Sequence, residues 1–470
     1  MKQLLFLTAV LLVNFTFSQE TKCNCSQALN QLINKIENNY PGFEDKTKDK
    51  ESYIDFKNNL ISQSKSSDDL ACQKTMKKYT DFFKDPHLWV GMNNRPFANA
   101  NNGSAEKLNI DIKDFQKNIV KSVDEFEGIW STDGYKIGIK KTNANEYVGF
   151  IIESASNSWK AGDVKFKIFS EQKFEYLLGD KSKKYGKYKF FDKNILFFDE
   201  IDVALAKEIS KPSVAFEQQE KRLKDLTGFS FKKVSEKTSI LKLPSFEHHL
   251  VKEIDKLIED NKALLENSEN LIIDIRGNGG GNGGGTTDAY QKLLPYISGK
   301  SIQHTGVEFL ASQTFLNSLE KYKKNLGKDE STEIVDNQIA KVKENLGRYF
   351  NYDEKGGLNR VQKIDVASKS PKNIIILANK WTGSSAEYLL YIAKQSKKVK
   401  IMGIPSYGAL DYGNAIYTEF GCQDYQLLLP TYKAMRLPEY PIDNIGIQPD
   451  IYLDQSVEDW TQFAIDYLEN

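Results

Sequence analysis

The feature that most constrains the fold is an alternation of apolar strands and amphipathic helices over residues 239–470. Short apolar runs, such as LIIDI at 271–275 and IIILA at 374–378, are separated by helical patterns of ten or more residues. This alternation is typical of βαβ units around a buried, mainly parallel sheet. We therefore predict an α/β domain over residues 236–470. Its charged, helical-looking segment 320–346 is either an insertion that covers another part of the domain or a solvated surface helix.

The middle and the beginning of the chain have other patterns. Aromatic-rich segments such as GYKIGIKK and EYVGFIIES alternate in polarity and are separated by Asn, Gly, Asp and Ser. They predict a β-rich domain at residues 101–235, either a small barrel or a degenerate PDZ domain, since WKAGDVKFKI resembles a PDZ phrase. A Lys/Glu-rich stretch near 203–226 has a helical pattern. The spacing in LNQLINKIENNY predicts a helical module at residues 19–100.

The first 18 residues, MKQLLFLTAVLLVNFTFS, place one lysine before a short apolar run, which is typical of a secretory signal peptide. No later segment approaches the roughly 20 consecutive apolar residues of a membrane-spanning helix. We predict an exported protein, periplasmic or extracellular, with no transmembrane segment after signal removal. The four cysteines fit an oxidising compartment, where either Cys23 or Cys25 is able to pair with Cys72.

The charges of the chain balance, with 64 Lys and Arg against 64 Asp and Glu. Such a chain has no overall field that would attract nucleic acid or an anionic membrane. The four histidines and four cysteines fit no zinc-binding template, so we expect no metal and no organic cofactor. Nothing in the composition indicates an oligomeric state.

A glycine-rich segment follows the apolar run at 271–275. Seven of the nine residues 277–285 are glycine, and the N–H groups of such a loop are able to bind an anion or a developing oxyanion. A dinucleotide-binding fingerprint requires an acidic residue at a suitable distance, and the sequence has none. A phosphate-binding P-loop requires a lysine after its last glycine, and no lysine follows Gly284 or Gly285. A glycine loop without a ligand remains the alternative.

Ser384, in WTGSSAE, follows the second apolar run and begins a predicted helix. Helix N-termini favour negative charge, which suits a nucleophile whose reaction generates an oxyanion. The spacing of Ser384 and Glu387 is also that of a capping box, which involves no catalysis. At this point both interpretations stand.

Taken together, LIIDIRGNGGG and the TGSSAE found about 100 residues later resemble peptidase family S41, the tail-specific and tricorn-type serine proteases. The resemblance covers about residues 239–453, including IGIQPDIYL near its end. It implies that Ser384 is the nucleophile. It also implies that the N–H groups of Ser385 and of Gly280 in the glycine loop face the oxyanion.

The general base has to be a residue other than the lysine of a Ser-Lys dyad, because Ala409 stands where the resemblance places that lysine. Tricorn-type members use a histidine and an acid, which implies His87 in KDPHLWV as the base and Asp443 in PIDNIGIQPD as the orienting acid. The family more often has Glu at the acid's place. Without the resemblance, His87 is a structural residue at a domain junction and Asp443 a turn residue. Lys242 is a substitute base or a surface lysine, and His248 and His249 are cap or surface residues.

These observations predict an exported serine peptidase that hydrolyses peptide or protein substrates through an acyl-enzyme. It would act as an endopeptidase or as a carboxy-terminal processing-like enzyme. The alternative, suggested by Ala409, is a non-catalytic protein that binds a peptide or an apolar ligand on the S41 scaffold. Esterase or carbohydrate-processing activity on the same machinery is a third interpretation.

Overall fold

A computed structural model of the chain describes most of its residues, in twelve ranges. The predicted signal peptide at 1–18 lies outside them, as do residues 282–287 of the glycine-rich segment. The described ranges are 24–92, 105–132, 134–156, 158–179, 181–209, 213–281, 288–327, 331–352, 359–369, 371–422, 425–454 and 456–470.

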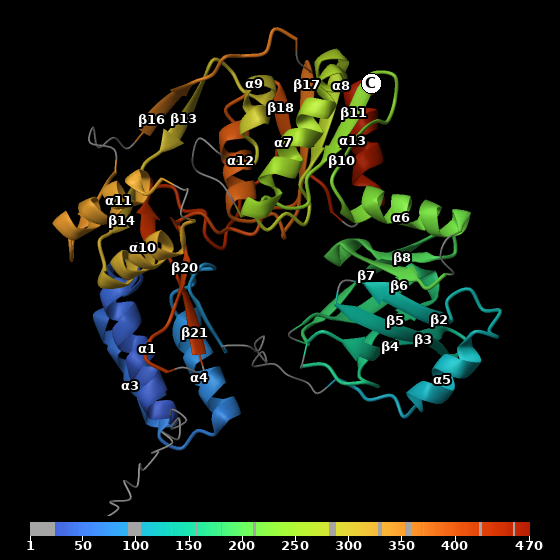
Figure 1. The fold of residues 1–470 in the computed structure, drawn as a ribbon, viewed down its shortest axis with the longest axis horizontal. Coiled ribbons are helices and arrows are strands. Elements are labelled where there is room, and N and C mark those ends of the chain that lie inside the picture. The colour runs from blue at the N-terminus through green and yellow to red at the C-terminus, as the bar shows by residue number, and fades with distance from the viewer. Residues whose placement is uncertain are drawn as a thin grey trace, which may run out of the picture.

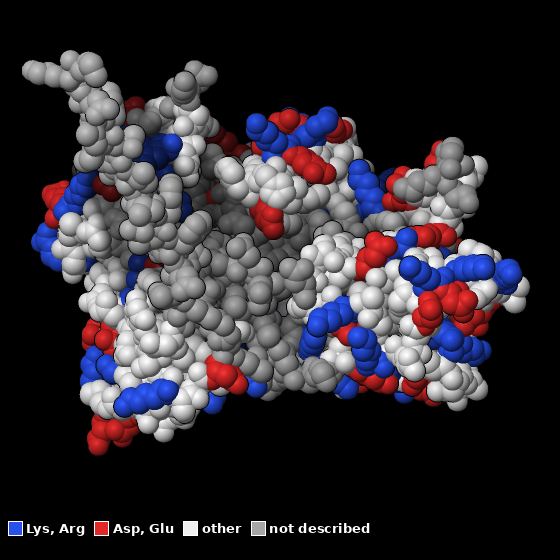
Figure 2. All heavy atoms as spheres, turned by 60° about the horizontal axis from the view of Figure 1, so that its bottom comes forward, with Lys and Arg blue, Asp and Glu red and all other residues white. Residues whose placement is uncertain are grey.

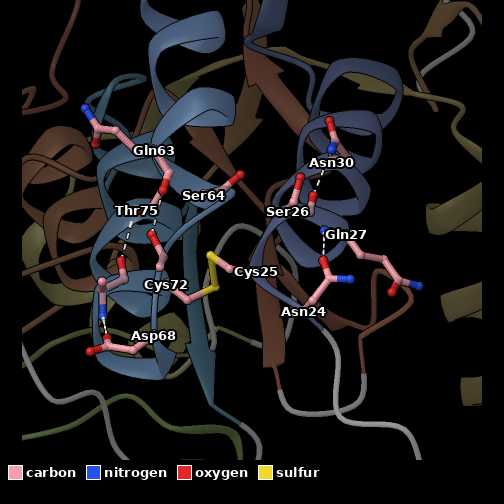
Figure 3. Close-up of a disulfide and its surroundings, with 12 residues drawn as sticks. Asn24, Cys25, Ser26, Gln27, Asn30, Gln63, Ser64, Asp68, Cys72 and Thr75 are labelled. Atoms are coloured by element: carbon pink, nitrogen blue, oxygen red, sulfur yellow. Dashed lines mark hydrogen bonds between the residues drawn. A yellow bond between two sulfur atoms is a disulfide. The ribbon is translucent and has the colours of Figure 1, made fainter.

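The chain begins with a bundle of helices, at the lower left of Figure 1. Helix α1 buries an apolar stripe, and the side chain of Asn24 caps it by accepting a hydrogen bond from the Gln27 N–H. A disulfide between Cys25 and Cys72 joins α1 to α4 (Figure 3). Cys422 is also disulfide-bonded. The helices of the bundle are α1 (Cys25–Asn39), α2 (Phe43–Lys46), α3 (Lys50–Ser64) and α4 (Asp69–Asp81).

The helical bundle shares its core with a distant part of the chain. Strand β1 (Trp89–Met92) follows the bundle and pairs with β21 (Tyr425–Leu429), which also pairs with β20 (Ile416–Thr418). Side chains from both regions bury one another, among them Tyr79, Tyr412 and Leu427. This pairing brings the turn that precedes β1 close to the segment that precedes β20, and the candidate site depends on that approach.

The middle of the chain is a closed eight-stranded barrel in which each strand pairs antiparallel with the next and β9 pairs with β2. Its interior is filled by aromatic and aliphatic side chains such as Trp130, Phe166 and Phe198. The stretch predicted as helical at 203–226 contains both the closing strand β9 and helix α6 (Val214–Thr227), because the barrel buries Leu205. Helix α5 (Ile112–Ile119) packs against β2. The strands are β2 (Gly128–Thr132), β3 (Tyr135–Asn143), β4 (Glu146–Ser154), β5 (Val164–Phe169), β6 (Lys173–Leu177), β7 (Lys183–Phe191), β8 (Ile195–Phe198) and β9 (Val203–Lys207).

The third part is a six-stranded sheet in the order β10-β11-β12-β17-β18-β23, parallel except for the β10–β11 pair. It begins at Ser230, ahead of the predicted domain boundary at residue 236, because β10 pairs with β11. The strands are β10 (Ser230–Lys233), β11 (Thr238–Lys242), β12 (Asn270–Asp274), β17 (Asn373–Ala378), β18 (Val399–Gly403) and β23 (Ile451–Tyr452).

Helices cover both faces of this sheet. Apolar side chains of α7, α9 and α12 pack on one face, and those of α13 pack on the other. Figure 1 shows α7 in front of the strands and α13 near the C-terminus. The helices are α7 (Val251–Asp260), α8 (Lys262–Asn267), α9 (Leu294–Ile297), α12 (Ser385–Ala393) and α13 (Trp460–Glu469).

The segment between α9 and β17 extends from the sheet toward the helical bundle. A two-stranded ribbon of β13 (Ser301–Thr305) and β16 (Asn359–Lys363) leads to α10 (Gln313–Asn325) and α11 (Glu333–Glu344). The charged segment predicted at 320–346 falls on these helices. Helix α10 contacts the bundle, where the Thr314 N–H donates to Asn39 Oδ1 at 3.2 Å. A small sheet beside them contains β14 (Val307–Leu310), β15 (Tyr349–Phe350), β19 (Tyr412–Gly413) and β22 (Tyr432–Ala434).

Basic and acidic side chains are mixed over the face drawn in Figure 2, with no area held by one sign alone. Some of the charged side chains form ion pairs, such as Lys183 with Glu175 at 2.8 Å. Within the described ranges, no helix combines the length and the apolar character needed to cross a membrane.

Candidate active site

The Ser384 hydroxyl lies on a tight turn between β17 and α12. Thr382 anchors the turn, since its buried hydroxyl donates to the Ile275 carbonyl at 3.0 Å, and the Gly383 N–H donates to the Asn278 carbonyl at 2.9 Å. Ser384 itself has φ 51° and ψ −120°. Positive φ is costly for a residue with a Cβ and is found preferentially at functional sites. The glycine-rich segment and the serine turn are therefore joined directly, and their contact holds the serine in a strained conformation.

His87 reaches Ser384 from the other end of the chain. It follows α4 in a turn where Asp85 Oδ1 accepts the His87 main-chain N–H at 2.8 Å. The His87 Nε2 atom lies 3.2 Å from Ser384 Oγ, and Nδ1 lies 2.7 Å from the Tyr412 carbonyl oxygen. A carbonyl oxygen only accepts hydrogen bonds, so Nδ1 carries the proton and Nε2 presents its lone pair to the hydroxyl. This is the tautomer that a general base requires.

The comparisons with known proteins concern the part of the chain that carries the sheet and the serine turn. The family model described as "Peptidase family S41" matches residues 237–453. Residues 237–453 belong to peptidase family S41. No curated protein matches the chain.

Among solved structures, several proteases resemble the whole chain at low identity. Mature CPAF complexed with lactacystin is 13% identical, with 92% of this chain and 93% of that chain covered and a TM-score of 0.47. The photosystem II D1 C-terminal processing protease is 11% identical, with coverages of 93% and 94% and a TM-score of 0.39. The tricorn protease is 12% identical, with coverages of 95% and 36% and a TM-score of 0.41. The family assignment rests on the family model.

The N–H groups of Ser385 and Gly280 were predicted to face the oxyanion, and the structure gives them different hydrogen-bond surroundings. Ser385 is the first residue of α12, so its N–H has no acceptor four residues back in the helix. The Gly280 N–H, in contrast, donates to Asn278 Oδ1 at 2.9 Å. The prediction for Gly280 therefore does not fit this geometry.

Gly280 has a steric role instead. It has φ +98°, and a Cβ at this residue would lie 2.8 Å from Ser384 Cβ and 2.9 Å from the Ser385 nitrogen. No side chain fits in that space. Glycine at this position lets the loop main chain lie against the turn that carries Ser384.

Asp443 was predicted to orient His87, but the two side chains are not bonded in the structure. Asp443 Oδ1 accepts the N–H groups of Leu410 and Asp411, each at 2.8 Å. Its Oδ2 atom is buried and has no hydrogen-bond partner among the described residues. Asp443 does not bond His87 directly, because His87 Nδ1 lies against the Tyr412 carbonyl.

Lys242, His248 and His249, the other candidates from the sequence, do not contact Ser384. The Lys242 ammonium group donates to the Leu226 carbonyl oxygen, next to Asp202. His248 and His249 lie in a single 3₁₀ turn before α7. Their surroundings give none of these three residues a contact with the serine.

Glu387 has a larger role than the capping box suggested. Its Oε2 atom accepts the N–H groups of Ser384 at 2.9 Å and Ala409 at 2.8 Å, and its Oε1 atom accepts the Ser406 hydroxyl and the Gly408 N–H, each at 2.6 Å. Burial raises the pKa of Glu387, and these hydrogen bonds oppose the rise. The carboxylate thus fastens the serine turn to the 406–409 loop.

We expect substitution of Glu387 to reduce both stability and catalysis. Glu387→Ala leaves three N–H groups and a hydroxyl without their acceptor, which should lower the free energy of unfolding by about 3 kcal/mol or more. Glu387→Gln should be nearly as harmful, since either placement of its amide points an NH₂ group at two donors. Denaturant titration and kcat measure the two effects. Wild-type values for the Gln variant would show that the carboxylate is not needed.

Two further contributors escaped prediction from the sequence. The Tyr412 carbonyl that fixes the histidine tautomer is a main-chain group. Every residue has one, so the residue type does not indicate this role. Asp85 carries a weak signal, because an Asp side chain commonly accepts the main-chain N–H of the residue two positions later in a local turn. Its other oxygen accepts the buried Tyr40 hydroxyl at 2.8 Å, and that pairing depends on the folded helical bundle.

Proposed function

We propose that the chain is a serine peptidase in which Ser384 is the nucleophile and His87 the general base. The observation that carries the proposal is the 3.2 Å approach of His87 Nε2 to Ser384 Oγ, with Nδ1 held on the Tyr412 carbonyl. An isolated serine hydroxyl is a weak nucleophile at neutral pH, and an adjacent base activates it. A serine that only capped α12 would not require a histidine from a separate part of the fold.

The reaction would proceed in two halves. Ser384 Oγ attacks the scissile carbonyl while its proton moves to His87 Nε2, and the Ser385 N–H at the start of α12 donates to the oxyanion. The imidazolium then protonates the leaving amine, which leaves an acyl-enzyme on Ser384. A water molecule, deprotonated by the same Nε2 atom, attacks the acyl carbonyl, and the bond to Ser384 Oγ breaks as the imidazolium returns the proton to that oxygen, which releases the second product.

Asp85 is the buried acidic residue bonded to the main chain of His87. Burial raises the pKa of Asp85, whereas the charge of His87 and the bonds to Tyr40 and to the His87 N–H lower it. When ionised, Asp85 would attract the positive ring that forms during the reaction, in a medium that screens charge poorly, without a bond to either ring nitrogen.

We also propose that the protein works outside the cytoplasm, in the periplasm or the extracellular medium. The Cys25–Cys72 disulfide supports this, because disulfides persist in oxidising compartments. The predicted signal peptide supports it independently.

Incubation of the purified protein with a mixture of unfolded proteins, followed by mass spectrometry of the new termini, tests the activity. We expect new internal or carboxy-terminal cleavages, and their positions separate an endopeptidase from a carboxy-terminal processing enzyme. Retention of peptides without any cleavage would reject the proposal in favour of the binding-protein alternative.

A further inference from the structure

Two buried aspartates bind each other's main chain beside the candidate base. Asp443 Oδ1 accepts the N–H groups of Leu410 and Asp411. In return, Asp411 accepts the N–H group of Ile442 at 2.9 Å and that of Asp443 at 3.0 Å. Both side chains are at most 7% exposed. We call this arrangement the reciprocal clamp; it fixes segment 410–411 against segment 442–443.

The reciprocal clamp lies directly before the main-chain group that contacts His87. Tyr412 directly follows the two N–H groups that Asp443 holds, and its carbonyl oxygen lies 2.7 Å from His87 Nδ1. Arg436 strengthens the same segment, since it donates to Asp411 Oδ1 at 2.6 Å and to the Leu410 carbonyl at 2.8 Å. The position of the Tyr412 carbonyl therefore depends on main-chain bonds made by carboxylates.

We propose that Asp443 is a positioning residue, which acts through Oδ1 and the main chain of residues 410–412 to hold the Tyr412 carbonyl on His87 Nδ1. The proposal rests on the function proposed above for Ser384 and His87. It replaces a charged partner of the imidazole with a structural acceptor that does not have to be ionised.

The surroundings of Asp443 support a neutral carboxyl group. Burial, together with the nearby carboxylates of Asp85 and Asp411, raises the pKa of Asp443 to about 8, while the hydrogen bond from the Asp411 main-chain N–H and the charge of Lys46 oppose the rise. A proton on Oδ2 would leave Oδ1 free to accept both N–H groups. Oδ2 has no hydrogen-bond partner among the described residues, so the structure assigns it no contact that an ionised form would require.

The matched variants Asp443→Asn and Asp443→Ala test this role. The asparagine keeps an oxygen in the place of Oδ1 and cannot ionise, so kcat/KM should stay within about threefold of wild type. The alanine removes the acceptor and frees the 410–412 segment, which should cost about 100-fold, as small displacements of catalytic groups do. An asparagine variant that folds and loses about 100-fold would overturn the proposal. Asp443→Asn decides the question even if the alanine variant does not fold.

The tautomer of His87 provides a readout that does not depend on hydrolysis. ¹⁵N NMR of histidine-labelled protein, with the His87 signals assigned from His87→Ala, should place the proton on Nδ1 in wild type and in Asp443→Asn, and should show that preference lost in Asp443→Ala. A proton on Nε2 in the wild type would overturn the positioning role. The Nδ1–H form without any peptidase activity would support the clamp and reject the proposed function, so the two failures are distinguishable.

Discussion

Ser384→Ala should lower kcat by roughly 10⁴- to 10⁶-fold, the range seen when a serine protease loses its nucleophile. The reason is that the remaining groups can bind a substrate and polarise its carbonyl but cannot form the acyl-enzyme. Stability should change little, because the substitution removes one oxygen atom at the start of α12. The measurement is kcat on a peptide that the wild type cleaves.

Ser66→Ala is the matched control for this variant. Ser66 is exposed between α3 and α4, on the bundle and away from the serine turn. The control should keep wild-type kcat. If Ser384→Ala also kept it, hydrolysis would have to come from another residue, and the assignment of the nucleophile would fail.

His87→Ala should reduce kcat by a similar factor, about 10⁴- to 10⁶-fold, because the hydroxyl then has no base within reach. No lysine replaces it, since the 406–409 loop has Ala409 with its N–H bonded to Glu387. The double variant Ser384→Ala, His87→Ala should be no slower than either single variant, since the two residues act as one unit.

His249→Ala is the control for the loss of an imidazole. The His249 side chain is 71% exposed and lies 3.3 Å from Glu247, in the turn before α7. The His249→Ala variant should have the kcat of the wild type.

Multiplicative losses of kcat in the double variant of Ser384 and His87 would contradict a shared proton-transfer step.

Patterns within short segments carried most of what could be predicted about the fold. The apolar runs that contain Leu271 and Ile375 indicate buried strands because each has no polar face to expose, and the structure has β12 and β17 there. The stretch at 203–207 shows the limit of this reasoning. VALAK has no strong strand pattern of its own, and it forms β9 because closure of the barrel supplies two partner strands and buries Leu205.

The candidate site also has parts that residue types predict and parts that they do not. Ser384 and His87 were predicted from residue types in a spacing that resembles a family, because chemistry restricts which residue types can serve as nucleophile and base. The structure places the two side chains 3.2 Å apart. The Gly280 N–H does not face the oxyanion position and Asp443 makes no direct bond to His87, because other groups take those hydrogen bonds. The Gly280 N–H donates to Asn278 Oδ1, and the Tyr412 carbonyl lies against His87 Nδ1. Nearly every residue type has a main-chain N–H and carbonyl, so the sequence does not show which of these groups will be free.

Labelling with a fluorophosphonate, followed by peptide mapping, tests the central claim most directly, because the reagent reacts with a serine that a base has activated. We predict one modified residue, Ser384, in the folded wild-type protein, and no detectable modification in folded His87→Ala. A folded wild-type protein that takes up no label, or one labelled equally well without His87, would contradict the claim that these two residues form a working pair.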